Sequence, residues 1–432
     1  MSFVKVSRRA VVASALALAA CNPLGGDGSG TQTTGQNIAD PVARRFYAAR
    51  GWSPTWDKTG AQKLTQIIAG ARTHGLDPAA FAPKPSAALS EDEALTVAAL
   101  AYAKALAVGF VEPRKVEKVF TLARNEADVA AGLAQALSQN DLEGWYGALA
   151  PHDDEYRALS GAYLAALSQS GLRSAPANGA PVGRSLAPAD QARQLAANLE
   201  RRRWLVRAPP DHRIDVNTAA ASLAYFKPGQ AQGARRVVAG REDHPTPSIE
   251  GAFHRLIANP PWRVPAEIAA KEILPKGDAY MAREDMHVED GRVVQAPGPK
   301  SALGLVKFDV EDPYDIYLHD TPSKALFAAD ERHRSHGCVR VEDAVGFARA
   351  IAAETSKADA FDQALEAKDT SELDLGQSIT VRMLYHTAYL GPSGQVLLVP
   401  DVYGTDDSLA AALGLGQAAA ARQIEPEILF GP

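Results

Sequence analysis

The hydrophobic pattern in the first half of the chain is that of amphipathic helices. Between residues 40 and 168, small and apolar residues recur every three or four positions among charged ones, and runs of β-branched residues are few. Gly75 followed by Asp77-Pro78 is typical of one helix ending and another beginning. We therefore predict an all-helical domain over residues 38–170. Its clearest helices are expected over residues 91–108, 127–138 and 154–167.

From Ile214 onward the pattern changes to short runs in which apolar and polar residues alternate. A period of two is typical of strands that bury one face, and turn sequences such as Lys227-Pro228-Gly229 separate the runs. We predict a mostly β domain over residues 211–410, with a helix at 341–354 and a tail over 411–432. The whole chain is thus expected to have an α+β fold. Strands are expected over residues 214–216, 222–226, 236–238, 248–257, 306–310, 315–318, 378–390 and 396–400.

Two further segments connect or interrupt these domains. Residues 171–189 are rich in Ala, Pro, Gly and Ser, which predicts a linker, and a connecting helix follows within residues 190–210. The arginines at positions 201–203 are expected to be a solvated helix end, stabilised by the helix dipole. Residues 265–303 begin with a helical pattern and continue as a Gly/Pro-rich stretch over 276–300. Because long insertions in compact domains are usually functional, we predict that this one forms a lid.

Residues 1–21 have the pattern of a lipoprotein signal peptide. Basic residues precede an apolar run of about eleven residues, which is shorter than the ~20 that a helix needs to cross a bilayer. The run ends in Leu18-Ala19-Ala20-Cys21, a lipobox in which Cys21 would carry the lipid. Residues 22–37 are rich in Gly, Thr, Ser and Gln and are expected to be a flexible tether. The protein is therefore expected in the periplasm, anchored by lipid to the inner or the outer membrane, after export by either the Sec or the twin-arginine route.

Composition narrows the classes of function. The 432 residues are 46% hydrophobic and 22% charged with a net charge of −6, which describes an ordinary globular protein, and no basic excess points to nucleic acid. There are two cysteines. If Cys21 is lipidated, no intramolecular disulfide can form and Cys338 is the remaining thiol. If the leader is instead an ordinary signal peptide cut after Ala20, Cys21 is left as a free thiol in an oxidising compartment.

Cys338 has the setting of a catalytic nucleophile. It is preceded by Ser335-His336-Gly337, and a free thiol needs a neighbouring base or cation to become a thiolate near neutral pH. His319, at the end of a predicted strand, and His336 are the two candidate bases. We prefer His319, because a residue arriving from a separate strand end reaches the sulfur without local backbone strain. The backbone carbonyl of Asp320 is the expected partner that orients the imidazole.

Neighbouring residues extend this candidate site. Gly337 permits a sharp turn, so the N–H groups of Gly337 and Cys338 are expected to stabilise an oxyanion. Arg340 either keeps the site electropositive or forms a salt bridge with Glu342 or Asp343.

The spacing His333-x-x-His336-x-Cys338 resembles a metal cluster. It lacks the further ligand that would close a zinc site, so we expect neither a metal nor a cofactor. The residues alone predict an exported, membrane-tethered cysteine acyltransferase or hydrolase.

The same residues resemble a known enzyme family. His319-Asp320-Thr321-Pro322, followed by Ser335-His336-Gly337-Cys338-Val339-Arg340, resembles the signature of the L,D-transpeptidases with a YkuD-type catalytic domain. The similarity is to the large Gram-negative subgroup with an N-terminal helical scaffold domain, and it covers almost the whole mature chain. Further landmarks are Phe46-Tyr47-Ala48-Ala49-Arg50-Gly51, His74-Gly75-Leu76-Asp77-Pro78, Asn198-Leu199-Glu200-Arg201, Thr246-Pro247, Asn259-Pro260-Pro261-Trp262-Arg263-Val264-Pro265, Lys271-Glu272-Ile273-Leu274-Pro275, and Leu303-Gly304 with Val306-Lys307-Phe308.

This resemblance implies peptidoglycan chemistry. A tetrapeptide stem would acylate Cys338 through its third, diaminopimelate-type residue and release D-alanine, and an amine of a second stem would then form a cross-link between two third residues. His319 would be the base, residues 265–303 would be the capping subdomain, and carbapenem-type β-lactams would acylate Cys338. The substrate groove would be lined by Tyr317, Ser335, His336, Arg340 and Trp262.

Other activities are open at this point. The same acyl-enzyme would make an L,D-carboxypeptidase if water resolved it, or an enzyme that attaches proteins to peptidoglycan or releases them. An inactive wall-binding lipoprotein is an alternative that predicts a broken motif, and a secreted cysteine protease would need a papain-like pattern that Cys338 does not have. Relatives usually carry a peptidoglycan-binding module before the catalytic domain, where this chain has the stretch 171–189, and their lids are longer.

Overall fold

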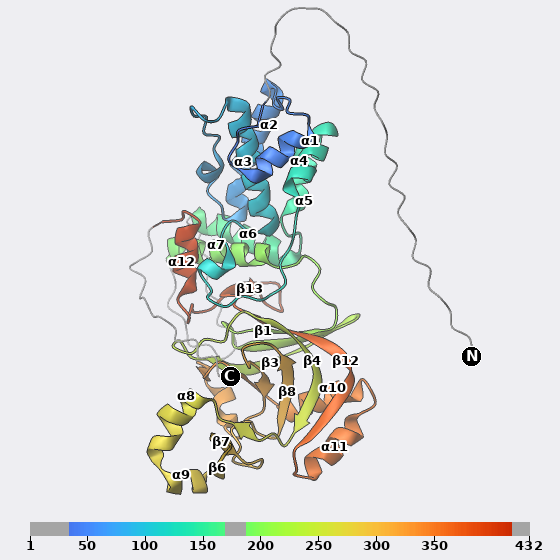
Figure 1. Cartoon of the computed structure of the whole chain (residues 1–432), viewed down its shortest axis with the longest axis vertical. Helices are drawn as coiled ribbons and strands as arrows, with labels where there is room; N and C mark the ends of the chain where they lie inside the picture. Colours follow the sequence, from blue (N-terminus) through green and yellow to red (C-terminus); the bar gives the residue numbers. More distant parts are fainter. Residues whose placement is uncertain (1–33, 169–186, 417–432) are drawn as a thin grey trace, which may run out of the picture.

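The computed structural model describes residues 34–168 and 187–416, which form a helical body and a β body arranged along the long axis of the molecule (Figure 1). The α+β fold predicted from the sequence is confirmed. The signal peptide with Cys21, most of the tether and linker, and residues 417–432 lie outside the described residues. Within the described ranges, no helix is long and apolar enough to span a membrane.

The helical body forms because the apolar stripes of its helices meet in one core, where Phe46, Tyr47 and Leu106 are fully buried. Its helices begin at capping residues, and Ser90 forms a reciprocal capping box with Glu93. The helices expected over 91–108 and 154–167 have those bounds. The helices are α1 (Pro41–Ala49), α2 (Lys58–Ala69), α3 (Glu91–Val108), α4 (Val129–Ser138), α5 (Leu142–Leu149), α6 (Asp154–Leu167) and α7 (Pro188–Trp204), with 3-10 turns η1 (Gly70–His74), η2 (Pro78–Phe81) and η3 (Pro113–Lys115).

A nine-stranded sheet makes up the β body. Its order is β10-β3-β11-β9-β8-β4-β12-β1-β2, and an additional pairing of β2 with β3 closes it into a ring. Alternate residues face inward, as in β1, where Ile214 and Val216 are fully buried, and Phe347 of α10 fills the same core. The elements are β1 (Arg213–Asn217), β2 (Ser222–Lys227), β3 (Gln230–Gly240), β4 (Glu250–Ala258), β8 (Val306–Glu311), β9 (Leu318–His319), β10 (His333–Ser335), β11 (Val339–Val341), α10 (Ala344–Ala353), α11 (Ala358–Glu366) and β12 (Ser371–Leu384), with the 3-10 turn η6 (Lys324–Ala328).

The prediction of a strand over residues 315–318 is wrong, because regular strand pairing in this segment covers only Leu318–His319. The carboxylate of Asp312 accepts hydrogen bonds from the backbone N–H groups of Tyr314 and Ile316 at 2.7 and 3.0 Å. Such side-chain to backbone bonds compete with strand pairing and hold this segment in a turn. The turn leads directly into the strand that carries His319.

The lid predicted over residues 265–303 has secondary structure and a core of its own. Its second half is therefore not the irregular Gly/Pro-rich stretch that the sequence predicted. Its three strands pair in the order β5-β7-β6, and Val264, Ile273, Met281 and Val293 are buried between strands and helices. Figure 1 shows it at the end of the molecule farthest from the helical body. Its elements are β5 (Trp262–Arg263), α8 (Ala266–Ile268), a π-helical turn (Ala269–Ile273), η5 (Leu274–Lys276), α9 (Asp278–Arg283), β6 (Met286–Glu289) and β7 (Arg292–Gln295).

The C-terminal part of the described chain returns to the helical body. Leu409 and Leu413 are buried in the helical core, beside α7. The segment expected to complete the β domain and begin a tail therefore packs on the other body. Its elements are β13 (Ala388–Leu390), β14 (Val396–Leu398) and α12 (Thr405–Ala412).

The arginines expected at a solvated helix end are largely buried, so that prediction is wrong. The side chains of Arg201 and Arg203 are 3% and 0% exposed, and each pairs with a carboxylate at 2.5 Å, Asp406 and Glu200 respectively. The end of α7 is enclosed because α6 packs on one side of this helix and α12 on another. A window of sequence around residue 201 contains no sign of that enclosure.

Candidate active site

The predicted nucleophile and base lie on neighbouring strands. β9 and β11 run parallel, with Arg340 directly opposite His319. The residues that alternate with these two along β9 and β11 face the core of the β body. Successive side chains of a strand point to opposite faces of the sheet. Tyr317, His319, Cys338 and Arg340 therefore share the face that looks away from that core.

The Cys338 thiol is partly exposed, and its Sγ lies 3.5 Å from the backbone carbonyl oxygen of Asp315. Its low-dielectric surroundings raise the pKa of the thiol to about 11, against the opposing effects of hydrogen bonding from Tyr317 and the charge of Lys307. At neutral pH the resting group is therefore a thiol, not a thiolate.

His319 is buried, and its Nδ1 donates a hydrogen bond to the backbone carbonyl of Asp320 at 2.5 Å, which is the orienting contact expected from the sequence. Burial, reinforced by the charge of Arg340, lowers the pKa of this imidazole to about 3. The Asp320 carboxylate accepts hydrogen bonds from the backbone of Leu305, at 3.0 Å, and from Lys324 Nζ, and so fixes the loop after His319.

In the part of the chain that the structure describes, the Cys338 thiol donates to the Asp315 carbonyl and receives hydrogen bonding from Tyr317, and it makes no hydrogen bond with His319. The two side chains occupy diagonal positions on the paired strands, because Cys338 precedes β11 and His319 ends β9. Diagonal neighbours on a sheet face are within reach of each other when their side chains turn. Proton transfer between them thus requires the thiol to leave Asp315.

The turn before the nucleophile depends on Gly337, whose φ of 115° is in the region that favours glycine. Its N–H donates to Ser335 Oγ at 3.2 Å, and its carbonyl accepts from Thr246 Oγ1 at 2.6 Å. The Gly337 N–H that was expected to help stabilise an oxyanion is therefore engaged in the turn. Within the described ranges the N–H of Cys338 makes no hydrogen bond to another backbone group, so it is available as a donor.

Arg340 does not form the salt bridge that was the alternative to a role in the site. Glu342 pairs with Arg236 at 2.5 Å, and the buried Nε of Arg340 has no hydrogen-bond partner among the described residues. A thiolate at Cys338 stabilises the charged form of Arg340, whose pKa is lowered by burial. Arg340 thus keeps this face electropositive.

His336, the alternative base, is tied to the lid. Its Nε2 lies 2.6 Å from Glu272 Oε1, in the π-helical turn, and 2.9 Å from Arg241 Nη1. The His244 ring stands edge-on to it at 5.2 Å. Burial lowers the pKa of His336, and the hydrogen bond with Glu272 opposes this shift.

Among the described residues, no group of three side chains is placed to hold a metal ion, and His333 Nε2 is 2.8 Å from the Thr218 carbonyl.

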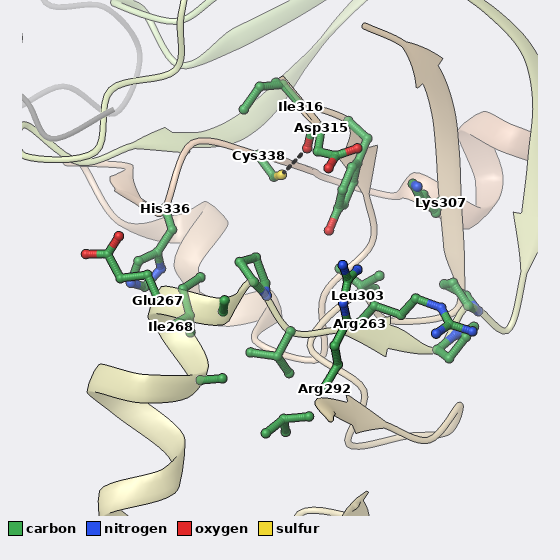
Figure 2. A pocket seen from close by; sticks show the side chains of 18 of the residues that line it. Arg263, Glu267, Ile268, Arg292, Leu303, Lys307, Asp315, Ile316, His336 and Cys338 are labelled. Atoms are coloured by element: carbon green, nitrogen blue, oxygen red, sulfur yellow. Dashed lines mark hydrogen bonds between the residues drawn. The ribbon is translucent and has the colours of Figure 1, made fainter. Parts of the chain in front are cut away.

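A pocket of about 950 Å³ opens from Cys338 toward the lid. Figure 2 shows the cysteine between two sides of this pocket, with His336 and Glu267 on one side and Lys307, Arg263 and Arg292 on the other. A volume of this size accommodates an extended peptide of a few residues.

Of the predicted groove residues, Tyr317 and His336 line the pocket. Ser335 and Arg340 are not among its lining residues. Trp262 packs against the core of the lid, and its neighbour Arg263 lines the pocket.

The charged lining of the pocket was not predicted from the sequence. For Lys307 a sign existed, because it alternates with the buried Val306 and Phe308 and so must face outward. Arg263 appeared only within a family landmark, and for Arg292 and Glu267 there was no sign, since only the folding of the insertion brings them to the pocket.

Comparisons with known proteins agree with this geometry. Residues 211–359 match the model of the YkuD L,D-transpeptidase catalytic domain, and residues 41–162 match that of the Scaffold domain. A protein of Haemophilus influenzae named "Putative L,D-transpeptidase" is 26% identical over 403 residues, covering 86% of this chain and 79% of its own. A solved structure, the Ldtfm-avibactam carbamoyl enzyme, shares 13% identity with a TM-score of 0.24, over 42% of this chain and 52% of that one. The present chain thus spans about half of that structure, and a likeness so loose carries no argument.

The YkuD match contains Cys338, His319 and the pocket, and the Scaffold match coincides with the helices that pack above the sheet. The chain therefore carries a YkuD-type L,D-transpeptidase catalytic domain over residues 211–359 and a Scaffold domain over residues 41–162.

Proposed function

We propose that this chain is a peptidoglycan cross-linking enzyme in which Cys338 carries the acyl group. The observation that supports this most directly is the position of Cys338: a partly exposed thiol that lines a peptide-sized pocket, on the same sheet face as His319 and Arg340. A nucleophile, a base and an electropositive surface on one face are what acyl transfer through a thioester needs.

The reaction follows from these positions. A tetrapeptide stem binds with the carbonyl of its third, diaminopimelate-type residue against Cys338. The thiol turns away from Asp315, His319 takes its proton as sulfur attacks the carbonyl, and the Cys338 N–H stabilises the oxyanion. When the tetrahedral intermediate collapses, the imidazolium gives the proton to the leaving amine, and D-alanine departs.

The second half of the reaction reverses the first. The side-chain amine of a second stem attacks the thioester, His319 accepts a proton from that amine, and the thiol leaves with it. The product is a cross-link between two third residues, and the enzyme returns to its neutral resting state. With water as acceptor the same steps give a carboxypeptidase, and with a protein amine they give attachment to the wall.

Peptidoglycan lies in the periplasm, and we propose that the protein works there, held to a membrane through Cys21. Carbapenem-type β-lactams present the same kind of acyl group to the thiol, so we propose that they acylate Cys338.

The test is intact mass spectrometry of the purified protein with a disaccharide-tetrapeptide and, separately, with meropenem. Loss of D-alanine with a new dimeric product is the expected result, and release of tripeptide alone would favour the carboxypeptidase. The absence of both turnover and drug adduct would favour the inactive wall-binding lipoprotein.

A further inference from the structure

Two arginines of the lid sheet have no side-chain partner in the part of the chain that the structure describes. Arg263 of β5 and Arg292 of β7 are exposed and form neither an ion pair nor a side-chain hydrogen bond. Other arginines around the pocket are paired: Arg241 lies 2.6 Å from Asp243, and Arg255 lies 3.0 Å from Glu372. Both unpaired arginines line the pocket that opens from Cys338.

The pairing of the lid strands puts these two side chains on the same face. β5 and β7 are antiparallel with Arg263 opposite Val294, and Arg292 is two residues before Val294. Residues directly opposite share a face, and so do residues two apart on one strand, so Arg263 and Arg292 are diagonal neighbours. Diagonal neighbours lie ~7–8 Å apart at their Cα atoms, close enough for two long side chains to converge on one group.

The charges nearby do not satisfy this pair. Lys307, on the same side of the pocket in Figure 2, is 2.9 Å from Asp309 and stacks over the Tyr317 ring at 4.2 Å. Four acidic residues line the pocket, and among the described residues none of them forms an ion pair with either arginine. Glu372 pairs with Arg255, Glu267 lies on the opposite side beside His336, Asp315 lies beside Cys338, and Asp290 is in the turn before β7. Glu289 stands opposite Arg292 on β6 without forming an ion pair with it. An anion bound between the two guanidinium groups would give each of them a charge-assisted contact.

The geometry points to a carboxylate-binding subsite, formed by Arg263 and Arg292, that holds a free carboxylate of the same stem peptide whose third residue is presented to Cys338. A planar guanidinium binds a carboxylate through two parallel hydrogen bonds, and two of them select strongly for a negative charge. Because the pocket is continuous from Cys338 to both arginines, one stem spans the two places. The inference rests on the proposed function and adds a substrate preference: stems with free carboxylates are good donors, and stems with amidated carboxylates are poor ones.

The experiment compares a tetrapeptide stem with its fully side-chain-amidated analogue as donors for the full chain. The rate of D-alanine release per active site gives kcat/KM for each. The unchanged protein is expected to prefer the free carboxylate by about tenfold or more. The double variant R263Q/R292Q is expected to lose this preference by a fall in kcat/KM for the free stem alone, whereas R263K/R292K retains part of it.

Two controls separate loss of the subsite from loss of the fold. Arg283→Gln changes a lid arginine that pairs with Glu284 and does not line the pocket, so the preference should stay unchanged. Titration of Cys338 with a neutral disulfide reagent should give the same rate in every variant.

The outcomes distinguish the subsite from the function on which it rests. Equal use of both donors by the unchanged protein, or a full preference in R263Q/R292Q, overturns the subsite and leaves the transpeptidase proposal standing. Failure of both stems to release D-alanine, with a thiol that titrates normally, overturns the proposed function itself and the subsite with it.

Discussion

At the scale of residues, Cys338 rests as a protonated thiol beside a neutral His319. The pKa of Cys338 is raised to about 11 and that of His319 is lowered to about 3, in both cases chiefly by burial, so each group is neutral at pH 7. Such a pair resists oxidation better than a preformed thiolate, because the thiolate is the reactive form. In the proposed reaction, substrate binding would have to bring the thiol and the imidazole together.

Replacing Cys338 by Ala should abolish acylation and leave the fold intact. The thiol donates to the Asp315 carbonyl and receives hydrogen bonding from Tyr317, contacts that are weak for a neutral sulfur, and its partial exposure means that no closed cavity forms. We therefore expect a change of under about 1 kcal/mol in the free energy of unfolding. Intact mass after incubation with meropenem and a urea titration would measure the two effects. A Cys338→Ala protein that still converted muropeptides would contradict the assignment of the nucleophile.

His319 should make the protein less stable in acid. Its pKa is about 6.5 in the unfolded chain and about 3 in the folded one, so between these values the unfolded state binds more protons and stability falls as pH falls. Above pH 6.5 the effect disappears. Urea unfolding at pH 7 and pH 4 should show a smaller loss for His319→Gln than for the unchanged protein, whereas equal losses would mean that His319 is not buried in its neutral form.

At the scale of elements, a π-helical turn connects the lid to the nucleophile loop. A π-helical turn inserts an extra residue in a helix and is frequent at functional sites. Here it presents Glu272 to His336, two residues before Cys338, and Arg241 joins the same cluster. The lid is thus positioned by contacts to the loop that carries the nucleophile.

Glu272→Gln should weaken that connection. The amide keeps the shape of the side chain and removes the charge, so the lid should open more often and KM for a tetrapeptide donor should rise by about 3- to 10-fold, with a smaller effect on kcat. The pKa of His336, followed by NMR, should fall further, because Glu272 now raises it. Glu284→Gln, whose partner is Arg283 elsewhere on the lid, is the matched control and should change neither quantity. An unchanged pKa of His336 would argue against the contact.

At the scale of the whole molecule, α7 joins the two bodies through buried polar groups. Arg201 lies 2.5 Å from Asp406 of α12 and 3.6 Å from Glu117 of the helical body, and Thr387 donates to the same Asp406 at 2.7 Å. A buried charge is tolerated only when it is paired and hydrogen-bonded, so these contacts fix the C-terminal segment in one place.

Asp406→Ala should destabilise the protein by roughly 2–4 kcal/mol, because it leaves the buried Arg201 with Glu117, at 3.6 Å, as its remaining ion-pair partner and with neutral hydrogen bonds such as that to Thr405. The adjacent Asp407→Ala is the matched control. Asp407 is 54% exposed in its pair with Arg193, so its loss should cost less than about 1 kcal/mol. Chemical denaturation of both variants would measure the difference, and equal losses would show that Arg201 finds water or another partner when Asp406 is removed.

The sequence by itself determined the features that depend on local pattern. Helix bounds such as 91–108 follow from caps and periodicity, and the alternation of Val306, Lys307 and Phe308 already assigns each side chain to a face. The segment from Ser335 to Arg340 also predicted the nucleophile, and the glycine turn that it predicted at Gly337 is confirmed. These properties are set by neighbours in the chain, so they can be inferred without the fold.

Only the tertiary structure decided how distant segments meet. The burial of Arg201 depends on α12, some 200 residues away, and the engagement of His336 depends on Glu272 in an insertion whose strands pair only after the lid has folded. The same is true of the thiol, whose partner is the Asp315 carbonyl because Asp312 holds a turn where a strand was expected. Burial and long-range pairing set pKa values and ion pairs, and neither quantity is encoded in a local stretch of sequence.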